Sequence, residues 1–342
     1  MKAAVLGASG YAGTELLRLA AGHPELDVAL ALGARASGRP VGEHTPALAA
    51  AYPDLLFEEI GGNLGDRLAG IDVVFSALPH GESQAVLPEL RGRVGLIVDL
   101  AADFRLRDPA AYPRWYGEAH RCPELLAESV YGLPELHRER LRGARFIAAP
   151  GCYPTAAILA LWPLASRGLV DLGAGVIVDA ASGVSGAGRS ASDRLHFGEV
   201  DENFKAYGLL DHRHTAEMEQ EIGATVLFTP HLAPMTRGIL ATCYARPADT
   251  RLDTAGALDT LGDAYGGEPF VSVVGESPAT KSTSGSNTVH VTARVDPRTG
   301  WVVALSALDN LVKGAAGQAI QAMNVAADLP EAAGLPAAGM YP

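Results

Sequence analysis

The chain opens with the stretch KAAVLGASGYAG, residues 2–13, which decides the class of its fold. Its first residues form a short apolar run, typical of a buried strand, and a helical pattern begins at Tyr11. Between them, Gly7 permits a tight turn, Gly10 a close approach of a phosphate group, and Gly13 close packing of the helix. A strand, a glycine-rich turn and a helix in this order predict a dinucleotide-binding unit.

Strand-like and helix-like segments continue to alternate beyond this stretch. The next strand candidates are residues 27–32, 72–78, 96–100 and 145–149. Alternation of this kind predicts a parallel sheet covered by helices. We therefore expect a Rossmann-type N-terminal domain over residues 1–150.

The pattern changes after residue 150, where strand-like segments follow one another with fewer helices between them. These candidates are residues 176–180, 225–229, 240–245, 270–274, 288–295 and 301–307. They predict an α+β domain with a partly antiparallel sheet over residues 151–307. A long amphipathic helix, expected at about residues 308–327, would pack back against the first domain and complete it. The chain as a whole is thus predicted to be an α/β protein of two domains.

Composition excludes several classes of function. The chain has 342 residues, and its net charge of −12 argues against general binding to nucleic acids or anionic membranes, but not against an anionic small-molecule substrate. Three widely spaced cysteines exclude a disulfide framework and a CxxC metal site. We expect no signal peptide and no membrane span, because no suitable basic and apolar segments occur. A cytoplasmic location in a reducing environment fits these features.

The segment after the second strand indicates which nicotinamide cofactor is bound. An acidic residue there would bind the ribose 2′-hydroxyl of NAD. Residues 33–39 contain no acid, whereas Arg35, Ser37 and Arg39 suit the 2′-phosphate of NADP. The alternative is that these arginines are merely solvated surface residues.

Cys152 lies in the run APGCYPT, residues 149–155. A strand leads into a Pro-Gly turn, and Pro154 is tolerated in the first turn of the helix that follows. The sequence therefore places Cys152 at a helix N-terminus, where the dipole and free amides stabilise a thiolate and a developing oxyanion. The alternative is a small buried hydrophobic residue.

Two histidines in the run HRHTAE, residues 212–217, are candidates for acid–base chemistry. Either His212 or His214 could deprotonate a thiol or protonate a leaving group, and Glu217 could orient His214. Glu217 could equally be a favourable first-turn acid. The two histidines flank an arginine, which also suits an anion, whereas a metal site lacks further ligands at fixed spacing.

Two further segments are candidates for ligand contact. Arg105 follows a strand of the predicted parallel sheet and could hold a phosphate or carboxylate, or form a salt bridge with Asp103 or Asp108. Residues 182–189, SGVSGAGR, combine glycines with hydroxyls and would let a ligand approach the backbone closely, unless they form a flexible surface loop.

Taken together and in order, these segments resemble the N-acetyl-γ-glutamyl-phosphate reductase family of the aspartate-semialdehyde dehydrogenase superfamily. The resemblance implies a Rossmann domain and a glyceraldehyde-phosphate-dehydrogenase-like catalytic domain, usually assembled as a homodimer or homotetramer. It also implies NADPH-dependent reduction of an acyl phosphate through a cysteine thioester, in arginine biosynthesis.

The resemblance also implies roles for individual residues. Cys152 would be the nucleophile and His214 the acid–base group. Arg105 would contact the substrate phosphate. Apart from the resemblance, we also expect substrate contacts from His212, Glu217 and Lys205. Contacts with the cofactor would come from Gly7, Ser9, Gly10, Tyr11, Ala12, Gly13, Ser182, Gly183 and Asn310, in addition to Arg35 and Ser37. Two positions depart from the family pattern: Ala101 stands where many relatives have Ser, and Ala149 where many have Asn.

Other functions remain open at this level. A related reductase could act on aspartyl phosphate or on a carrier-linked aminoadipyl phosphate. A Cys-His thiol hydrolase would leave the glycine loop unused, and a non-catalytic NADP-binding redox sensor would leave Arg105 and residues 182–189 unexplained.

Overall fold

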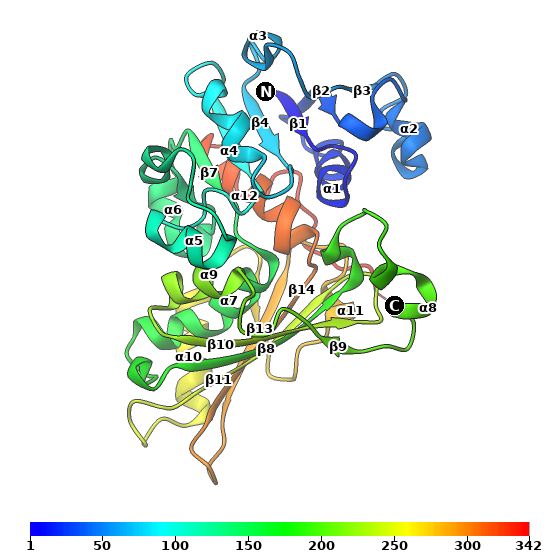
Figure 1. The fold of residues 1–342 in the computed structure, drawn as a ribbon. Coiled ribbons are helices and arrows are strands. Elements are labelled where there is room, and N and C mark those ends of the chain that lie inside the picture. The colour runs from blue at the N-terminus through cyan, green and yellow to red at the C-terminus, as the bar shows by residue number, and fades with distance from the viewer. Residues whose placement is uncertain (342) are drawn as a thin grey trace. The chain divides into compact units, whose positions relative to one another are not determined.

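The computed structural model describes residues 1–341, apart from the side chain of Arg35 (Figure 1). The chain divides into two compact units. Unit 1 contains residues 1–150 and 315–335, and unit 2 contains residues 151–314 and 336–342. No helix in the described part of the chain is both long and apolar enough to cross a membrane.

Unit 1 is built on a seven-stranded sheet in the order β3-β2-β1-β4-β5-β7-β6, with every pair parallel. Its strands are β1 (Lys2–Leu6), β2 (Asp27–Leu32), β3 (Phe57–Glu58), β4 (Val73–Ser76), β5 (Leu96–Asp99), β6 (Val130–Tyr131) and β7 (Phe146–Ala148). The strand order reverses between β1 and β4, and sheets of this kind bind ligands at the carboxyl ends of the strands beside such a reversal.

The helices of unit 1 are mostly short, and two longer ones pack near the sheet. They are α1 (Tyr11–Ala20), α2 (Val41–His44), α3 (Leu64–Arg67), α4 (Ser83–Val86), α5 (Tyr112–Tyr116), α6 (Pro134–Leu141) and α12 (Gly317–Ala326). Strands β4 and β5 are buried along their whole length, which explains why both read as continuous apolar runs.

The last helix differs from the expectation of one helix over about residues 308–327. Leu308 ends a strand, residues 312–316 form a π-helical turn, and α12 begins only at Gly317. The cause is Asp309, whose carboxylate accepts the N–H groups of Leu311 (2.8 Å) and Val312 (3.1 Å) and so favours a turn over a regular helix. Helix α12 belongs to unit 1 and contacts α1, α6 and β5.

Unit 2 contains a mixed seven-stranded sheet in the order β12-β13-β14-β11-β8-β10-β9. Its strands are β8 (Val176–Gly183), β9 (Lys205–Ala206), β10 (Val226–Ala233), β11 (Ile239–Ala245), β12 (Val271–Val273), β13 (Val289–Val295) and β14 (Val302–Leu308). Pairs β8–β10 and β12–β13 are parallel and the other pairs antiparallel. The predicted α/β class, a parallel sheet followed by a partly antiparallel one, is confirmed.

The helices of unit 2 are α7 (Cys152–Ser166), α8 (Phe197–Val200), α9 (His214–Ile222), α10 (Thr254–Tyr265) and α11 (Thr280–Thr283). Helices α7 and α10 pack on the sheet, and α7 is almost entirely buried. Buried residues alternate with half-exposed ones along β8 and β11, so the helices cover one face of the sheet more fully than the other.

Strand β8 is longer than the sequence predicts. It continues through Ser182, which pairs with Leu232 of β10 and Ile239 of β11, to Gly183, which pairs with Ala233 of β10. A Ser-Gly pair is typical of a turn, but pairing with the neighbouring strands keeps both residues in the sheet. Only the residues after Gly183 leave the strand.

Candidate active site

Cys152 is the first residue of helix α7, and Gly151 caps it with extended backbone angles (φ −70°, ψ 153°). The first turn of a helix leaves backbone N–H groups without intrahelical partners, so Cys152 lies where a thiolate is favoured. The backbone of Gly314 packs against it, because a Cβ at residue 314 would lie 2.8 Å from Cβ of Cys152. Cys152 is half-buried.

His214 lies against the residue that precedes the cysteine. A Cβ built on Gly151 would be only 2.5 Å from Nε2 of His214, so the imidazole occupies the space that a side chain at residue 151 would need. Glu217, one turn along α9, is fully buried, and its Oε2 accepts the N–H of Gly151 at 3.0 Å. Its Oε1 is 3.9 Å from Nε2 of His214. The structure thus brings together Cys152, His214 and Glu217 around Gly151.

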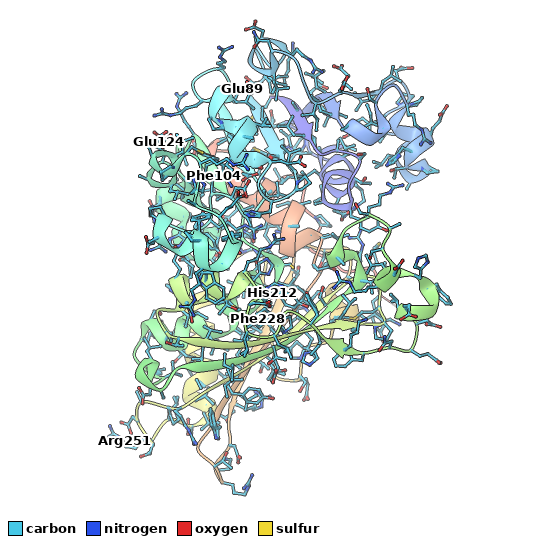
Figure 2. The ribbon with its side chains drawn as sticks, viewed as in Figure 1. Glu89, Phe104, Glu124, His212, Phe228 and Arg251 are labelled. Atoms are coloured by element: carbon cyan, nitrogen blue, oxygen red, sulfur yellow. The ribbon has the colours of Figure 1, made fainter. Side chains whose placement is uncertain are left out.

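His212 lies beside Phe228 (Figure 2). Its Nδ1 accepts the backbone N–H of His214 at 3.2 Å, and its ring meets the edges of Tyr207 and Phe228. Burial, together with the neighbouring Arg213, lowers the pKa of His212 to about 4. At neutral pH His212 is therefore an uncharged ring that fixes the turn before α9.

A cavity of about 430 Å³ opens beside Cys152 within unit 2. Its lining in the described residues includes three cationic side chains and no carboxylate. Among the lining residues are Cys152, Tyr153, Ser182, Arg194, Lys205, Tyr207, His212, Arg213 and His214. A cavity with this lining suits an anionic ligand. Glu217 is not among the lining residues, and its burial places it behind His214.

Two tyrosines form a fixed wall of this cavity. The hydroxyl of Tyr153 donates to the carbonyl of His231 (2.9 Å), and that of Tyr207 donates to the hydroxyl of Tyr153 (3.2 Å). Burial raises the pKa of Tyr207 to about 12 and raises that of Tyr153 as well, so both stay neutral. Sequence reasoning missed both residues, although the position of Tyr153 next to Cys152 was a usable indication.

Asn310 and Ser182 lie at the ends of neighbouring segments of unit 2. Oδ1 of Asn310 accepts the N–H of Gly238 (2.8 Å), and its Nδ2 donates to Oγ of Ser185 (2.9 Å). The hydroxyl of Ser182 donates to the carbonyl of Gly183 (2.9 Å). Asn310 thus ties the segment after β8 to the turn before β11.

The glycine loop of unit 1 is built for close approach. Gly7 has a positive φ of 74°, and a Cβ there would strike the carbonyl of Ala77. A Cβ on Gly13 would strike the carbonyl of Gly7, so α1 starts in contact with the loop. The N-cap of α1 is Gly10, which leaves the N–H groups of Tyr11, Ala12 and Gly13 at the helix start. This cradle fits a pyrophosphate group.

The segment expected to select the cofactor follows β2. Ser37 and Arg39 are exposed there, whereas the side chain of Arg35 lies outside the described part of the chain. Ser9 is close by, because a Cβ on Gly33 would be 2.8 Å from its Oγ. These placements keep Ser9, Ser37 and Arg39 at the same end of β2.

Arg105 lies in the loop after β5 of unit 1. It is 7% exposed, and its Nη2 donates to the carbonyl of Leu100 at 2.6 Å. Within the described residues, no group of three or more His, Cys, Asp or Glu side chains is arranged to hold a metal ion.

Comparison with known proteins agrees with this arrangement. Residues 2–144 match the model of the semialdehyde dehydrogenase NAD binding domain, and residues 152–310 match that of the semialdehyde dehydrogenase dimerisation domain. An N-acetyl-gamma-glutamyl-phosphate reductase from Symbiobacterium thermophilum is 50% identical, over 100% of this chain and 99% of the relative. One from Desulforudis audaxviator is 48% identical over 100% of both. The chain belongs to the N-acetyl-γ-glutamyl-phosphate reductase family.

The fold also resembles those of solved aspartate semialdehyde dehydrogenases. Aspartate semialdehyde dehydrogenase II from Vibrio cholerae superposes with a TM-score of 0.70 at 16% identity, covering 95% of this chain and 97% of that one. The enzyme from Candida albicans, solved with NADP, gives a TM-score of 0.65 at 16% identity, with the same coverage. This chain therefore shares its fold with these dehydrogenases.

Ala149 and Ala101 are the two positions at which the resemblance led us to expect a departure from the family pattern. Both are buried, at 0% and 5% exposure. Neither supplies a polar side chain, so hydrogen bonds at these two positions come from the backbone: the N–H of Ala149 donates to the carbonyl of Asp99 (2.8 Å), and that of Ala101 to its carboxylate (3.1 Å).

Proposed function

We propose that the protein is an N-acetyl-γ-glutamyl-phosphate reductase of arginine biosynthesis. It would convert N-acetyl-γ-glutamyl phosphate and NADPH into N-acetylglutamate 5-semialdehyde, NADP⁺ and phosphate. The observation that carries the proposal is the cluster at the start of α7, where a thiol, an imidazole and a buried carboxylate meet at Gly151. Full-length identity of 50% to a relative of that name supports the choice of substrate.

Cys152 acts as the nucleophile in this proposal. Its thiolate attacks the acyl carbon, phosphate leaves with the electron pair of the broken C–O bond, and a thioester to Cys152 remains. The N–H groups in the first turn of α7 hold the oxyanion. With Ala149 in place of an amide side chain, we assign this role to the backbone alone.

His214 moves the protons. It takes the thiol proton before the attack and returns a proton to sulfur as the aldehyde departs. Glu217 holds the His214 ring and the Gly151 peptide in position relative to each other. We therefore assign it a positioning role and no substrate contact. His212, neutral at physiological pH, holds the backbone of His214 and contacts the substrate through its uncharged ring.

The cations of the cavity select the substrate. Lys205, Arg194 and Arg213 surround a space whose lining includes no carboxylate, which suits the α-carboxylate of an acylated glutamate. The tyrosine wall keeps its shape, because both hydroxyls are engaged in hydrogen bonds.

The glycine loop of unit 1 would hold NADPH, which when bound would supply the hydride for the reduction. A Cβ at Gly7 or at Gly13 would overlap neighbouring backbone, which supports a loop kept clear for a pyrophosphate. A preference for NADPH over NADH is supported by Ser37 and Arg39 and by the lack of an acid in residues 33–39. Asn310 would reach the carboxamide of the nicotinamide.

A homodimer is supported by the face of the unit 2 sheet that its helices cover less fully. Leu227 on β10 pairs with Ile177 on β8, which pairs with Tyr244 on β11, which in turn pairs with Val303 on β14. This apolar row is half-exposed, and Leu227 is 50% exposed. Burying such a face against a second copy would account for its composition. The apolar row thus consists of Leu227, Ile177, Tyr244 and Val303, one residue from each of four neighbouring strands.

The deciding experiment runs the reaction backwards. Purified protein is given N-acetylglutamate 5-semialdehyde, phosphate and NADP⁺, and NADPH formation is followed. We expect phosphate-dependent turnover with the acetylated substrate, no turnover in Cys152→Ser, and a preference for NADP⁺ over NAD⁺.

The same assay separates the rivals. Turnover only with aspartate semialdehyde, or only with a carrier-linked aminoadipate semialdehyde, would keep the chemistry and change the substrate. Tight NADPH binding without turnover of any of the three would contradict the proposal and favour a redox sensor.

A further inference from the structure

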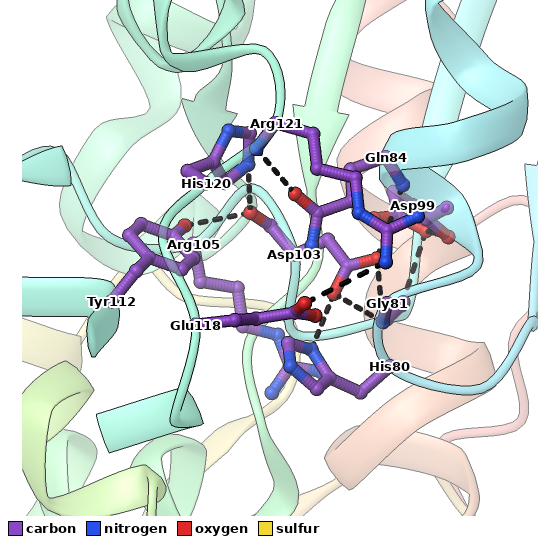
Figure 3. Close-up of polar contacts among 12 residues, drawn as sticks. His80, Gly81, Gln84, Asp99, Asp103, Arg105, Tyr112, Glu118, His120 and Arg121 are labelled. Carbon is purple, nitrogen blue, oxygen red and sulfur yellow. Dashed lines mark hydrogen bonds and ion pairs between the residues drawn. The ribbon is translucent and has the colours of Figure 1, made fainter. Parts of the chain in front are cut away.

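A buried polar network surrounds Asp103, in the loop after β5 (Figure 3). The fully buried carboxylate accepts the N–H groups of Gly81 (2.8 Å) and Gln84 (3.1 Å) and pairs with Nδ1 of His80. Burial alone would raise the pKa of Asp103, but the hydrogen bonds from His80 and the two N–H groups hold it below its ordinary value. Asp103 is therefore an anion that faces His80.

Two histidines meet this residue, and they differ in one respect. His120 uses both ring nitrogens: Nε2 bonds to the carbonyl of Asp103 (2.8 Å), and Nδ1 accepts the N–H of Cys122 (3.2 Å). His80 uses only Nδ1, and its buried Nε2 has no hydrogen-bond partner among the described residues. A buried polar atom without a partner costs on the order of 1–3 kcal/mol, so it calls for a ligand.

The ring of His80 is held firmly. It stacks on Tyr116 with centroids 4.5 Å apart and is paired with Asp103 on one side. Its side chain keeps 18% of its surface exposed. The ring is therefore held in one orientation, and its unpartnered Nε2 is preorganised to bind a ligand.

The position of His80 in the fold indicates the chemistry of that ligand. His80 follows β4 and Arg105 follows β5, so both come from the carboxyl edge of the parallel sheet. Ligands of such sheets bind at this edge. In Figure 3 the Arg105 side chain points toward His80. Glu118, which lies beside Gly81, has its carboxylate 3.6 Å from Nη2 of Arg121.

We propose that His80 is a further ligand of the phosphoryl group that the family resemblance assigns to Arg105, and that Asp103 is the positioning residue of His80. The carboxylate at Nδ1 fixes the ring, so that Nε2 is directed to donate to a phosphate oxygen. The inference rests on the proposed function: the phosphoryl group is that of the acyl phosphate, or of free phosphate in the reverse direction. The pyrophosphate of the cofactor has the same chemistry, and the experiment separates the two.

The test compares His80→Asn with the matched variant His120→Asn in the reverse reaction. Both replace a histidine that contacts Asp103, but only His80 has an unused nitrogen. We expect His80→Asn to raise the KM for phosphate at least tenfold and to leave the Kd of NADPH within twofold. His120→Asn should leave the KM for phosphate within twofold, whatever its effect on melting temperature. If His80→Asn fails to fold, His80→Gln replaces it.

The Asp103→Asn variant distinguishes a positioning role from a purely structural one, because the two roles predict different changes in KM and kcat. Asparagine still accepts the two N–H groups through Oδ1 but has no charge for His80. We expect the KM for phosphate to rise much more than kcat falls, whereas a general loss of structure would lower kcat and melting temperature together.

Three results would overturn the proposal: an unchanged KM for phosphate in His80→Asn, an equal rise in His120→Asn, or a loss confined to NADPH affinity, which would assign the pair to the cofactor. Failure of the proposed function is recognised separately. Inorganic phosphate alone should raise the melting temperature of the wild-type protein, and His80→Asn should abolish that rise. If His80→Asn abolishes that rise while the acetylated semialdehyde is not turned over, the phosphate site is supported and the proposed substrate is contradicted.

Discussion

At the scale of single residues, the proposed chemistry depends on contacts around one glycine. Gly151 donates to Glu217, and its missing side chain leaves room for the ring of His214. Its backbone angles suit any residue, so glycine is required here by that close contact and not by backbone conformation.

Gly151→Ala therefore tests the cluster with one added carbon. The new Cβ would lie 2.5 Å from Nε2 of His214 and must displace the ring. We expect kcat to fall by about 10²-fold or more, since an acid–base group is worth roughly 10²–10⁴ in rate. Gly267→Ala is the control, because nothing lies within 4 Å of a Cβ there. Equal activity in the two variants would show that the position of His214 does not limit the rate.

The two histidines of residues 212–217 should behave differently. His214→Asn should lower kcat by about 10²–10⁴-fold. His212→Asn should cost less and should keep the shape of the pH–rate profile above pH 5, because a group with a pKa of about 4 is already deprotonated there. Steady-state rates across pH check both. A near-normal kcat in His214→Asn would move the acid–base role to His212.

At the scale of the element, the start of α1 shows how a helix terminus becomes a binding site. Gly7 and Gly13 let the helix touch the turn that precedes it, and Gly10 caps the helix without a side chain. The first-turn N–H groups can then point at a phosphate with nothing in between. The start of helix α7 likewise presents first-turn N–H groups beside Cys152.

Gly13→Ala should damage this loop, because its Cβ would overlap the carbonyl of Gly7. We expect the Kd of NADPH to rise at least tenfold, measured by fluorescence titration. Gly22→Ala, just beyond the same helix, is the matched control, since its nearest contact would be an ordinary 3.7 Å. Unchanged affinity in Gly13→Ala would place the cofactor elsewhere.

At the scale of the whole molecule, the core of unit 1 should make stability depend on pH through Asp99. Burial raises the pKa of Asp99 to about 7, against hydrogen bonds from Ser83 and Ala101. Its Oδ2 has no hydrogen-bond partner among the described residues, so a negative charge there would lack a donor to stabilise it. The folded state therefore keeps a proton that the unfolded state releases above pH 4. Stability from this group is full below about pH 4 and is lost as pH rises toward about 7.

The Asp99→Asn substitution should remove this dependence of folding stability on pH. At pH 8 we expect the variant to be more stable than the wild type by an amount on the order of 3 kcal/mol, with a higher melting temperature. At pH 4.5 the two should be close. Chemical denaturation at both pH values checks this, and a variant that is less stable at pH 8 would contradict it.

The apolar row across the sheet of unit 2 gives a prediction about assembly. Leu227→Glu places a charge at its exposed end, so we expect the proposed dimer to weaken by tenfold or more in Kd. Analytical ultracentrifugation over a dilution series measures this. Thr229→Glu, two residues along β10 on the same face, tests how far the interface extends. A wild-type protein that sediments as a monomer at micromolar concentration would rule out the dimer.

The sequence by itself determined the class of the fold and the place of Cys152 at the start of a helix. Glycines at 7, 10 and 13, alternating strands, and a cysteine before a helix are local signals, because they depend on backbone conformation over a few residues. They sufficed to predict a parallel sheet, a partly antiparallel one, and the position of Cys152 at a helix start.

Only the tertiary structure decided which groups meet. Glu217 and Gly151 are 66 residues apart in sequence, and their hydrogen bond follows from the packing of α9 beside α7. The neutrality of His212 depends on burial, and the unused nitrogen of His80 on a carboxylate from another loop. Burial and long-range pairing are properties of the packed chain, so no local pattern reports them.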